Sequence, residues 1–419
     1  MMLLGALLLG LPLSIAVAIP QTDALVSYDG FKVFRITTGD ALESVQEKLS
    51  IFATEPWNRD VSRHIDVALA PDQLADFDAL GLDATVMHED LGADIAAESA
   101  LAESNLMERQ QSGIDLTWFN SYHAYDDHIE FLKNLQASFP NQTEIVTAGE
   151  SVQGRTLTGI HIWGSNGKGS RPAILFHGTV HAREWISTMT TEFIATQLLI
   201  NDTAQDFLDN YDFYIMPVVN PDGFAYTQTT NRLWRKNRSP APSGSRCLGV
   251  DVNRNWPYQW DVPGGSSTDP CSETYRGPTA GSTPEMKGLI SQIDSLKDGP
   301  GIKLYIDWHS YGQYILTPYG YSCDAVAVNQ AKHEELAKGT GDALTTAGGQ
   351  QWTTGPSCST LYATSGSSTD YLSDVAGAEY SLTLELRDEG RFGFVLPASQ
   401  ILPSGKEQWA GMQYLLANL

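Results

Sequence analysis

Short continuous apolar runs alternate with amphipathic stretches along the C-terminal three quarters of the chain. The runs are typical of strands buried on both faces of a sheet, and the stretches have the three- and four-residue spacing of helices. We therefore expect an α/β fold with one mixed β-sheet covered by helices on both faces. The expected strands include Ala173–Phe176, Phe213–Val219, Lys303–Trp308 and Tyr380–Leu386, and the expected helices include Trp185–Leu199, Thr283–Leu296 and Ala331–Thr346.

The segment from residue 19 to about residue 111 has a different pattern, in which shorter strand-like runs alternate with helical periodicity. This alternation predicts a small α/β sandwich that precedes the larger domain. The expected strands are Lys32–Ile36, Ile65–Leu69 and Ala84–Met87, and the expected helices are Ala41–Ile51, Pro71–Leu80 and about Gly92–Arg109.

Charge is distributed unevenly between these two parts. The chain of 419 residues has a net charge of −24, and residues 19–111 alone hold 18 acidic and 6 basic residues, which is half of that net charge. Such an excess of acid argues against nucleic acid or an anionic membrane as a partner. The polar stretch Gln110-Gln-Ser-Gly113 is a plausible processing boundary, so we expect residues 112–419 to form the second domain, as a monomer.

The first 18 residues are typical of a secretory signal peptide. An apolar stretch runs from Met2 to about Leu13 and is followed by Ala16-Val-Ala18, the small-residue pattern at which such peptides are cleaved. No later segment is apolar enough to span a bilayer. We therefore expect a secreted protein, in which the four cysteines form two disulfides with three possible pairings. Three glycosylation sequons are available, at Asn141, Asn201 and Asn237.

Candidate metal ligands lie close to the end of the first expected strand. His181 and Glu184 are three residues apart, and His309 follows 125 residues after Glu184. Two imidazoles and one carboxylate form a hydrolytic zinc site that leaves a fourth position open for water. The pair lies where a strand gives way to a helix, which is the sheet edge where α/β folds bind ligands.

The sequence around these ligands resembles a known family. The run His177-Gly-Thr-Val-His-Ala-Arg-Glu-Trp-Ile-Ser187 is similar to the zinc-binding signature of the digestive zinc carboxypeptidases, the carboxypeptidase A/B family. The resemblance is strong over residues 112–419 and looser before them, and it implies an exopeptidase that is made as an inactive precursor and removes the C-terminal residue of peptides and proteins. Four further blocks occur in the family's order, namely Asn220-Pro-Asp-Gly-Phe224 with Asn231-Arg-Leu-Trp-Arg-Lys236, Cys247-Leu-Gly-Val-Asp-Val-Asn-Arg-Asn-Trp256, His309-Ser-Tyr311, and Glu385-Leu-Arg-Asp388 with Gly390-Arg-Phe-Gly-Phe394.

The resemblance assigns chemical roles to individual residues. One Zn²⁺ per chain would be held by His181, Glu184 and His309. Asp251 would accept a hydrogen bond from the outer nitrogen of His181. Glu385 would be the catalytic carboxylate that takes a proton from water and returns it to the leaving amine. The resemblance also implies that Arg235 stabilises the oxyanion that develops on the scissile carbonyl.

Substrate binding is assigned in the same way. Arg254, beside Asn253, would hold the terminal carboxylate of the substrate in a bidentate grip, which makes the enzyme an exopeptidase. Arg183 would contact the substrate further along, and Tyr362 would close over the bound C-terminus. The remaining residues that the family match places along the substrate are Ser310, Tyr311 and Phe394.

The pocket for the last side chain of the substrate looks uncharged at its base. Thr369 stands where members specific for basic residues carry Asp, so the resemblance favours apolar or aromatic C-terminal residues. Asp307 departs from the family, which usually has a small hydroxyl residue there. Asp307 shares a strand face with His309, and it either binds a pocket water or a neighbouring group, or attracts a basic side chain. The pocket residues by alignment are Asp307, Leu316, Gly320, Leu361, Thr364, Ser367, Thr369 and Thr383.

The acidic N-terminal segment is a propeptide by resemblance, folded over the active site. Its charge would complement a cleft rich in arginine, at Arg183, Arg235 and Arg254. The alternative is a regulatory or binding domain that stays attached. Arg109 is an isolated basic residue close to the expected boundary, so we expect a trypsin-like protease to activate the precursor there.

The resemblance makes two structural predictions and leaves two alternatives for function. It predicts the disulfides Cys247–Cys271 and Cys323–Cys358, and cis peptide bonds at 310–311, 318–319 and 387–388. One alternative is the same enzyme with a preference for basic C-terminal residues through Asp307. The other is an inactive binding protein on this fold, against which the complete set of ligands and catalytic residues argues.

Overall fold

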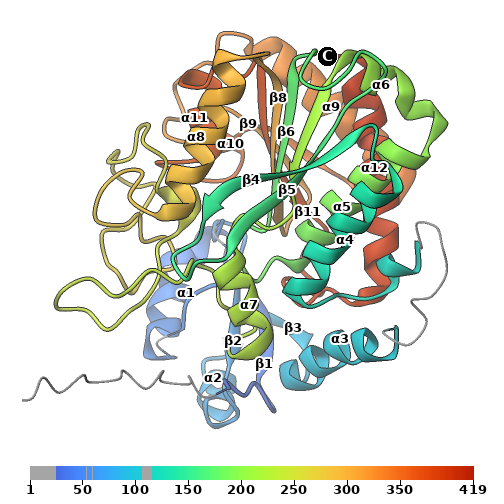
Figure 1. Cartoon of the computed structure of the whole chain (residues 1–419). Coiled ribbons are helices and arrows are strands. Elements are labelled where there is room, and N and C mark those ends of the chain that lie inside the picture. Colours follow the sequence, from blue (N-terminus) through green and yellow to red (C-terminus); the bar gives the residue numbers. More distant parts are fainter. Residues whose placement is uncertain (1–24, 53, 59, 106–115) are drawn as a thin grey trace, which may run out of the picture.

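The computed structural model describes residues 25–52, 54–58, 60–105 and 116–419. The expected signal peptide, Arg109 and the expected domain boundary lie outside the described residues. Figure 1 shows two sheets, a small one built from the start of the chain and a large one built from the rest. We call residues 25–105 the N-terminal unit and residues 116–419 the C-terminal unit.

The N-terminal unit is an antiparallel three-stranded sheet of order β2-β1-β3 with helices packed on it. Phe34 and Ile36 of the first strand are buried with Val67 of the second and Phe77 of a helix, so the unit has an apolar core of its own. The predicted strand–helix alternation is confirmed. The elements are β1 Lys32–Thr37, α1 Leu42–Leu49, β2 His64–Leu69, α2 Leu74–Ala79, β3 Ala84–His88 and α3 Leu91–Asn105.

The C-terminal unit is built on a mixed eight-stranded sheet of order β10-β9-β11-β8-β6-β7-β5-β4. Its four central strands, β11, β8, β6 and β7, are mutually parallel, and they are the four strands that the apolar runs predict. Antiparallel strands flank this centre on both sides. The strands are β4 Thr143–Glu150, β5 Thr156–Ile162, β6 Ala173–Gly178, β7 Asp212–Met216, β8 Ile302–Ser310, β9 Tyr314–Thr317, β10 Thr353–Pro356 and β11 Tyr380–Leu386.

Helices cover both faces of the large sheet, which explains why its central strands are buried along most of their length. Two separate buried clusters fill the two sides, one including Trp185, Met189 and Trp409 and the other including Met286 and Leu289. In Figure 1, α5 and α12 lie on one side of the sheet and α8 and α11 on the other. The helices are α4 Tyr125–Ser138, α5 Trp185–Ile200, α6 Gln205–Asn210, α7 Pro221–Thr229, α8 Pro284–Asp298, α9 Gln330–Gly348, α10 Ser357–Thr360, α11 Ser368–Asp374 and α12 Ile401–Ala417.

The N-terminal unit packs against the end of the large sheet through an apolar cluster and a buried ion pair. Val33 and Trp57 join Phe394 of the C-terminal unit in one buried cluster. Glu98 accepts two hydrogen bonds from the Arg232 guanidinium, at 2.6 and 2.9 Å, and both side chains are buried. A bidentate pair of this kind fixes orientation as well as position.

The expected charge complementarity between the two units is wrong in its details. Arg235 pairs with Asp251 and Arg183 with Glu273, both of the C-terminal unit, and Arg254 donates to the carbonyl of Gly265. Glu98 of the N-terminal unit pairs across the boundary with a different arginine, Arg232. The three arginines already have acceptors of their own, so the acidic composition of the N-terminal unit does not identify the contact.

Covalent and backbone features agree with the resemblance. Both predicted disulfides are formed, with Cα–Cα distances of 5.0 Å for Cys247–Cys271 and 4.8 Å for Cys323–Cys358. The three predicted cis peptide bonds are present at 310–311, 318–319 and 387–388. The side chain of Asn237 is buried and donates to Glu285, which excludes a glycan on it in the folded chain, whereas Asn141 is exposed.

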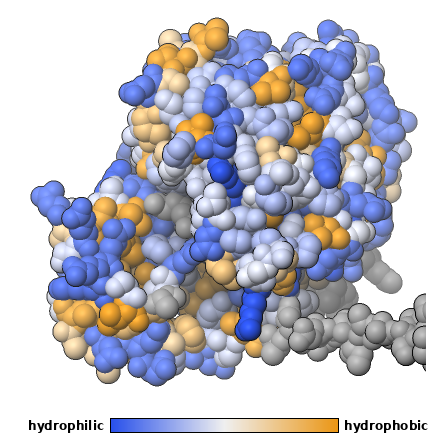
Figure 2. Space-filling model, turned by 90° about the vertical axis from the view of Figure 1, so that its left-hand side faces the viewer, coloured by the Kyte–Doolittle hydropathy of each residue, from blue (hydrophilic) through white to orange (hydrophobic). Residues whose placement is uncertain are grey.

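The surface of the molecule is predominantly hydrophilic where Figure 2 shows it. On that face, hydrophobic residues lie in small groups among hydrophilic ones. Among the described residues, no helix is both long and apolar enough to cross a membrane.

Candidate metal centre and active site

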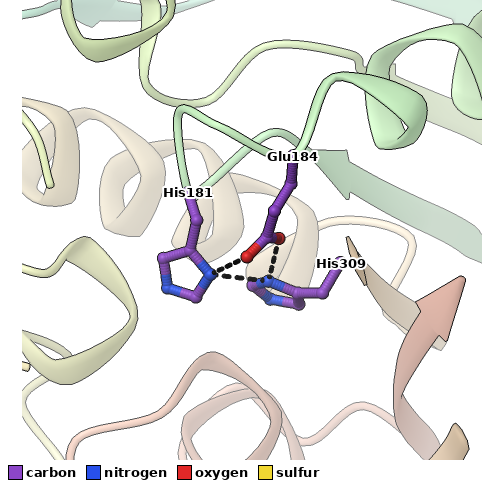
Figure 3. Close-up of side chains that lie close together, drawn as sticks. All are labelled: His181, Glu184 and His309. Carbon is purple, nitrogen blue, oxygen red and sulfur yellow. Dashed lines mark hydrogen bonds and ion pairs between the residues drawn. The ribbon is translucent and has the colours of Figure 1, made fainter. Parts of the chain in front are cut away.

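The three expected metal ligands converge at the carboxyl ends of two neighbouring strands. His181 and Glu184 lie in the turn between β6 and α5, and His309 is the penultimate residue of β8, which pairs with β6 in parallel. The Nδ1 atoms of the two histidines are 3.0 Å apart. Glu184 places Oε1 2.9 Å from Nδ1 of His181 and Oε2 3.0 Å from Nδ1 of His309, as Figure 3 shows.

These side chains fit a zinc ion. Zn–N bonds of about 2.0–2.1 Å in a tetrahedral site place two nitrogen ligands about 3.3 Å apart, close to the observed separation of the Nδ1 atoms. All three side chains are buried, and their ligand atoms lie within 4.8 Å of one another. A buried carboxylate between two imidazoles also suits a shared cation, because a bound cation compensates its desolvation. His181 and Glu184 line a larger cavity as well, which leaves room on one side for water and substrate.

Asp251 connects the metal site to the neighbouring arginine. Its Oδ1 lies 3.1 Å from Nε2 of His181, and its Oδ2 accepts a hydrogen bond of 2.9 Å from Arg235. Burial on its own would raise the pKa of the Asp251 carboxyl, but the charges of Arg235 and His181 hold that pKa well below its usual range. The side chain is therefore ionised, and it can orient His181 with Nδ1 toward the metal position.

Glu385 lies beside the metal position without belonging to the ligand cluster. It is on β11, directly across from His309 in the parallel pairing with β8, and it lines both an inner pocket and the larger cavity. Burial raises the pKa of Glu385 to about 8, and the nearby carboxylate of Glu184 adds to that effect. A carboxylate with a raised pKa is suited to exchange protons near neutral pH, and a bound cation would lower that pKa.

The inner pocket joins the metal position to Arg254. Arg254 is buried and donates to the carbonyl oxygens of Gly265 at 2.9 Å and Asn253 at 2.8 Å, which fixes the plane of its guanidinium. It lines the same pocket as His181, His309 and Glu385. The positively charged guanidinium of Arg254 is thereby held in the same pocket as Glu385, the candidate catalytic carboxylate.

Most of the expected pocket residues line this inner pocket, and two do not. Gly320 is covered by the side chain of Thr364, which would collide with a Cβ at position 320. Asp307 is fully buried and does not reach the pocket surface, so the expectation that it lines the pocket is wrong. Those that do line it are Leu316, Leu361, Thr364, Ser367, Thr369 and Thr383.

Two further pocket residues were missed by the sequence analysis. Ser357 begins the one-turn helix α10, and nothing in its surroundings marks it as functional. Asp370 lies in the first turn of α11 and accepts hydrogen bonds from the backbone N–H groups of Gly320 and Tyr321. Burial raises the pKa of Asp370 to about 6. An acidic residue in the first turn of a helix commonly only stabilises that helix, so the sequence did not mark Asp370 as a pocket residue.

The larger cavity lies between the two units. It has a volume of about 290 Å³ and is bounded by both units. Tyr311 donates a hydrogen bond of 2.7 Å to Asp66 of the N-terminal unit, and Phe394 lies against Trp57 with ring centroids 5.6 Å apart. Tyr362 contributes to the wall of both the cavity and the inner pocket, at the passage between them. The N-terminal residues that line the cavity are Arg35, Trp57, Asn58, Asp60, Arg63 and His64.

The other two expected substrate contacts are also held in place. Ser310 lines the cavity, and its backbone N–H donates to Glu184 at 3.2 Å. The Arg183 guanidinium lies over the ring of Phe394, 4.1 Å from its centroid, and donates to Glu273.

A buried His–Glu–His cluster beside the Glu385 carboxylate fits a metal-dependent hydrolase, and sequence comparison gives the family. The model of the zinc carboxypeptidase family matches residues 128–411, and the chain belongs to that family. It is 45% identical over 420 residues to metallocarboxypeptidase A of Trichophyton rubrum. The matched region covers 97% of this chain and 98% of that relative. It is 39% identical over 296 residues to carboxypeptidase B of Astacus astacus, with coverage of 70% and 96%.

Solved structures agree with this assignment over nearly the whole chain. Carboxypeptidase A from Helicoverpa armigera superimposes with a TM-score of 0.81 at 28% identity, covering 93% of this chain and 98% of that one. Thrombin activatable fibrinolysis inhibitor superimposes with a TM-score of 0.83 at 26% identity, covering 92% and 98%. The predicted fold is confirmed, and the chain is a metallocarboxypeptidase, a hydrolase that acts on the C-termini of peptides.

The cluster predicts one zinc ion per chain. Chelation should abolish peptidase activity and added zinc should restore it, because the ion supplies the positive charge that activates water. In metal analysis of the purified protein, His309→Ala should lose the bound zinc, whereas His333→Ala, at a buried histidine on α9, should retain one equivalent. Full activity of the metal-free protein would reject the zinc assignment.

Proposed function

We propose that this protein is a secreted zinc exopeptidase that removes apolar or aromatic residues from the C-termini of peptides and proteins, and that it is made as an inactive precursor. The observation that carries the proposal is the shared inner pocket. His181, Glu385 and Arg254 all line it. A substrate whose terminal carboxylate meets Arg254 would present its last peptide bond to the metal and the catalytic carboxylate.

Each step of the proposed reaction is assigned to a residue. Zinc, when bound, supplies the Lewis acidity that makes water a nucleophile near neutral pH. Arg254 and Asn253 bind the terminal carboxylate, and Tyr362 closes over it. Glu385 takes a proton from the attacking water and gives it to the leaving amine. Arg235, held by Asp251, donates to the carbonyl oxygen as negative charge develops there.

The lining of the pocket supports the preference for uncharged side chains. Thr369 and Thr383 face each other with their hydroxyl oxygens 2.5 Å apart, so one hydroxyl donates to the other and neither carries a charge. Leu316 and Leu361 add apolar surface. The carboxylate of Asp370 already accepts three backbone contacts from Gly320 and Tyr321, which offsets its charge.

This pocket predicts the order of preference for C-terminal residues. In a panel of blocked dipeptides that differ only in the last residue, kcat/KM should be highest for Phe and Leu and at least about tenfold lower for Arg and Lys, since burying an unpaired cation costs more than about 1.4 kcal/mol. A preference for Arg or Lys would contradict the proposed specificity and favour the alternative with a basic preference.

Arg254 and Glu385 should fail in different ways when they are changed. Arg254→Ala should raise KM strongly, because the terminal carboxylate is bound in both the ground state and the transition state. Glu385→Gln keeps the size of the side chain but removes its basicity, so kcat should fall by at least about 10²-fold with KM little changed.

Two controls make this comparison decisive. Arg246→Ala, at an exposed arginine, should leave both constants unchanged. Zinc content should be normal in Glu385→Gln, because Glu385 is not a ligand. Near-native kcat in Glu385→Gln, or loss of its metal, would show that another group acts as the base.

The N-terminal unit is proposed to be a propeptide that keeps the enzyme latent. Trp57 and Arg63 line the cavity that a substrate must enter, and Asp66 engages the hydroxyl of Tyr311. The Glu98–Arg232 pair helps to keep the unit in this position. Residues 19–111 would be removed by a trypsin-like protease near Arg109, in a protein that acts as a monomer.

Cleavage near Arg109 should therefore increase activity. Limited trypsin treatment of the purified precursor should release the N-terminal unit and raise kcat/KM for a blocked dipeptide, since the cavity becomes open to substrate. The Arg109→Ala precursor should remain intact and latent under the same treatment. Equal activity of the wild-type protein before and after cleavage would refute the role of a lid.

A further inference from the structure

Asp307 lies against the metal ligand His309 but has no part in the reaction proposed above. It is fully buried on β8, two residues before the metal ligand His309 and on the same face of the strand. Its Oδ2 lies 3.0 Å from Nε2 of His309 and accepts a hydrogen bond of 2.5 Å from the Ser368 hydroxyl. These contacts place Asp307 behind the metal ligand, on the side away from the metal position.

The protonation of His309 decides what Asp307 can do there. When Nδ1 binds a metal, the single proton of a neutral imidazole is on Nε2, and that N–H needs an acceptor. Two polar side-chain atoms lie near it, Asp307 Oδ2 at 3.0 Å and Asn253 Nδ2 at 3.2 Å.

Only one of these two atoms can accept. The side-chain oxygen of Asn253 receives a hydrogen bond of 2.8 Å from the backbone N–H of Ser368. That contact orients the amide so that its NH₂ group, which is a donor, faces His309. The carboxylate of Asp307 is therefore the acceptor for the Nε2–H group, and Asn253 keeps its donor available for substrate.

We propose that Asp307 is a positioning residue that orients His309 for zinc and strengthens its binding, and not a determinant of substrate specificity. The inference rests on the proposed zinc site. It gives the second histidine a carboxylate partner that matches the one Asp251 provides to His181. Each imidazole ligand would then be held by a buried carboxylate on its outer nitrogen, in a fixed tautomer.

The burial of Asp307 argues against the rival role in specificity. A basic side chain in the inner pocket would have to displace Ser368 or His309 to reach the carboxylate. Exposing it in that way would remove the hydrogen bond from Ser368 and leave the Nε2–H group of His309 without its acceptor. The buried negative charge of Asp307 is instead offset by the hydrogen bond from the Nε2–H group of His309. That N–H group becomes a stronger donor when a cation binds at Nδ1.

The test is the zinc dissociation constant of the full chain, measured by competition with a chromophoric chelator. Loss of such an outer carboxylate typically weakens metal binding by about 10- to 100-fold. Asp307→Ser, whose hydroxyl is too short to reach His309, should show the larger effect. Asp307→Asn keeps the size and a neutral acceptor, so it should show an effect of about tenfold, and it decides the question if the serine variant does not fold.

A matched control separates this role from general loss of a buried carboxylate. Glu192 is also buried against an imidazole, with Oε1 2.8 Å from Nδ1 of His128, but it lies away from the metal position. Glu192→Gln should lower the thermal stability of the protein and leave the zinc dissociation constant unchanged. A purely structural role for Asp307 would give its variants the behaviour of this control.

The possible results are distinguishable. If the wild-type chain binds zinc and both Asp307 variants bind it equally well, the inference is overturned and the proposed function stands. If the wild-type chain binds no zinc, both fail. After activation, the ratio of kcat/KM for C-terminal Arg to that for Phe should be the same in the wild type and in Asp307→Asn, and a drop in that ratio would assign Asp307 to specificity instead.

Discussion

The active site depends on the parallel pairing of β6 and β8. Parallel neighbours end at the same edge of a sheet, so His181, just after β6, and His309, near the end of β8, meet with their Nδ1 atoms 3.0 Å apart. β11 pairs with β8 on its other side and brings Glu385 across from His309. Strands that are distant in sequence thereby bring the candidate metal ligands and the proposed catalytic carboxylate to one edge, where α/β folds bind their ligands.

Buried charge around the metal position is balanced by pairing. Asp251 is shared between His181 and Arg235, and Glu184 lies between the two imidazoles. Such groups are expensive to bury alone, and removing one partner leaves the other without compensation. The same network therefore joins the candidate ligand His181 to Arg235, the residue proposed to stabilise the oxyanion.

The centre of the fold and the candidate metal cluster could be predicted from the sequence, whereas the surroundings of the site could not. A strand buried on both faces can leave a continuous apolar run, as in β6, and β7, β8 and β11 were predicted together with it. The edge strand β10, Thr353–Pro356, is short and polar and carries no such signal. The period of a strand placed Asp307 on the face of His309, but it could not reveal that Ser368, 61 residues later, closes the other side. Composition gave the charge of the N-terminal unit, yet Arg35 and Arg63 face the cavity, because net charge does not say which side chains a surface presents.

His181, Glu184 and His309 are proposed to hold one zinc ion at the edge of the sheet. A crystal structure of the protein grown with zinc, with diffraction recorded on both sides of the zinc absorption edge, tests it most directly. We expect a single strong anomalous peak per chain, within about 2.3 Å of Nδ1 of both histidines and of an oxygen of Glu184. A peak elsewhere, or zinc bound through the Nε2 atoms with Asp251 and Asp307 displaced, would contradict it.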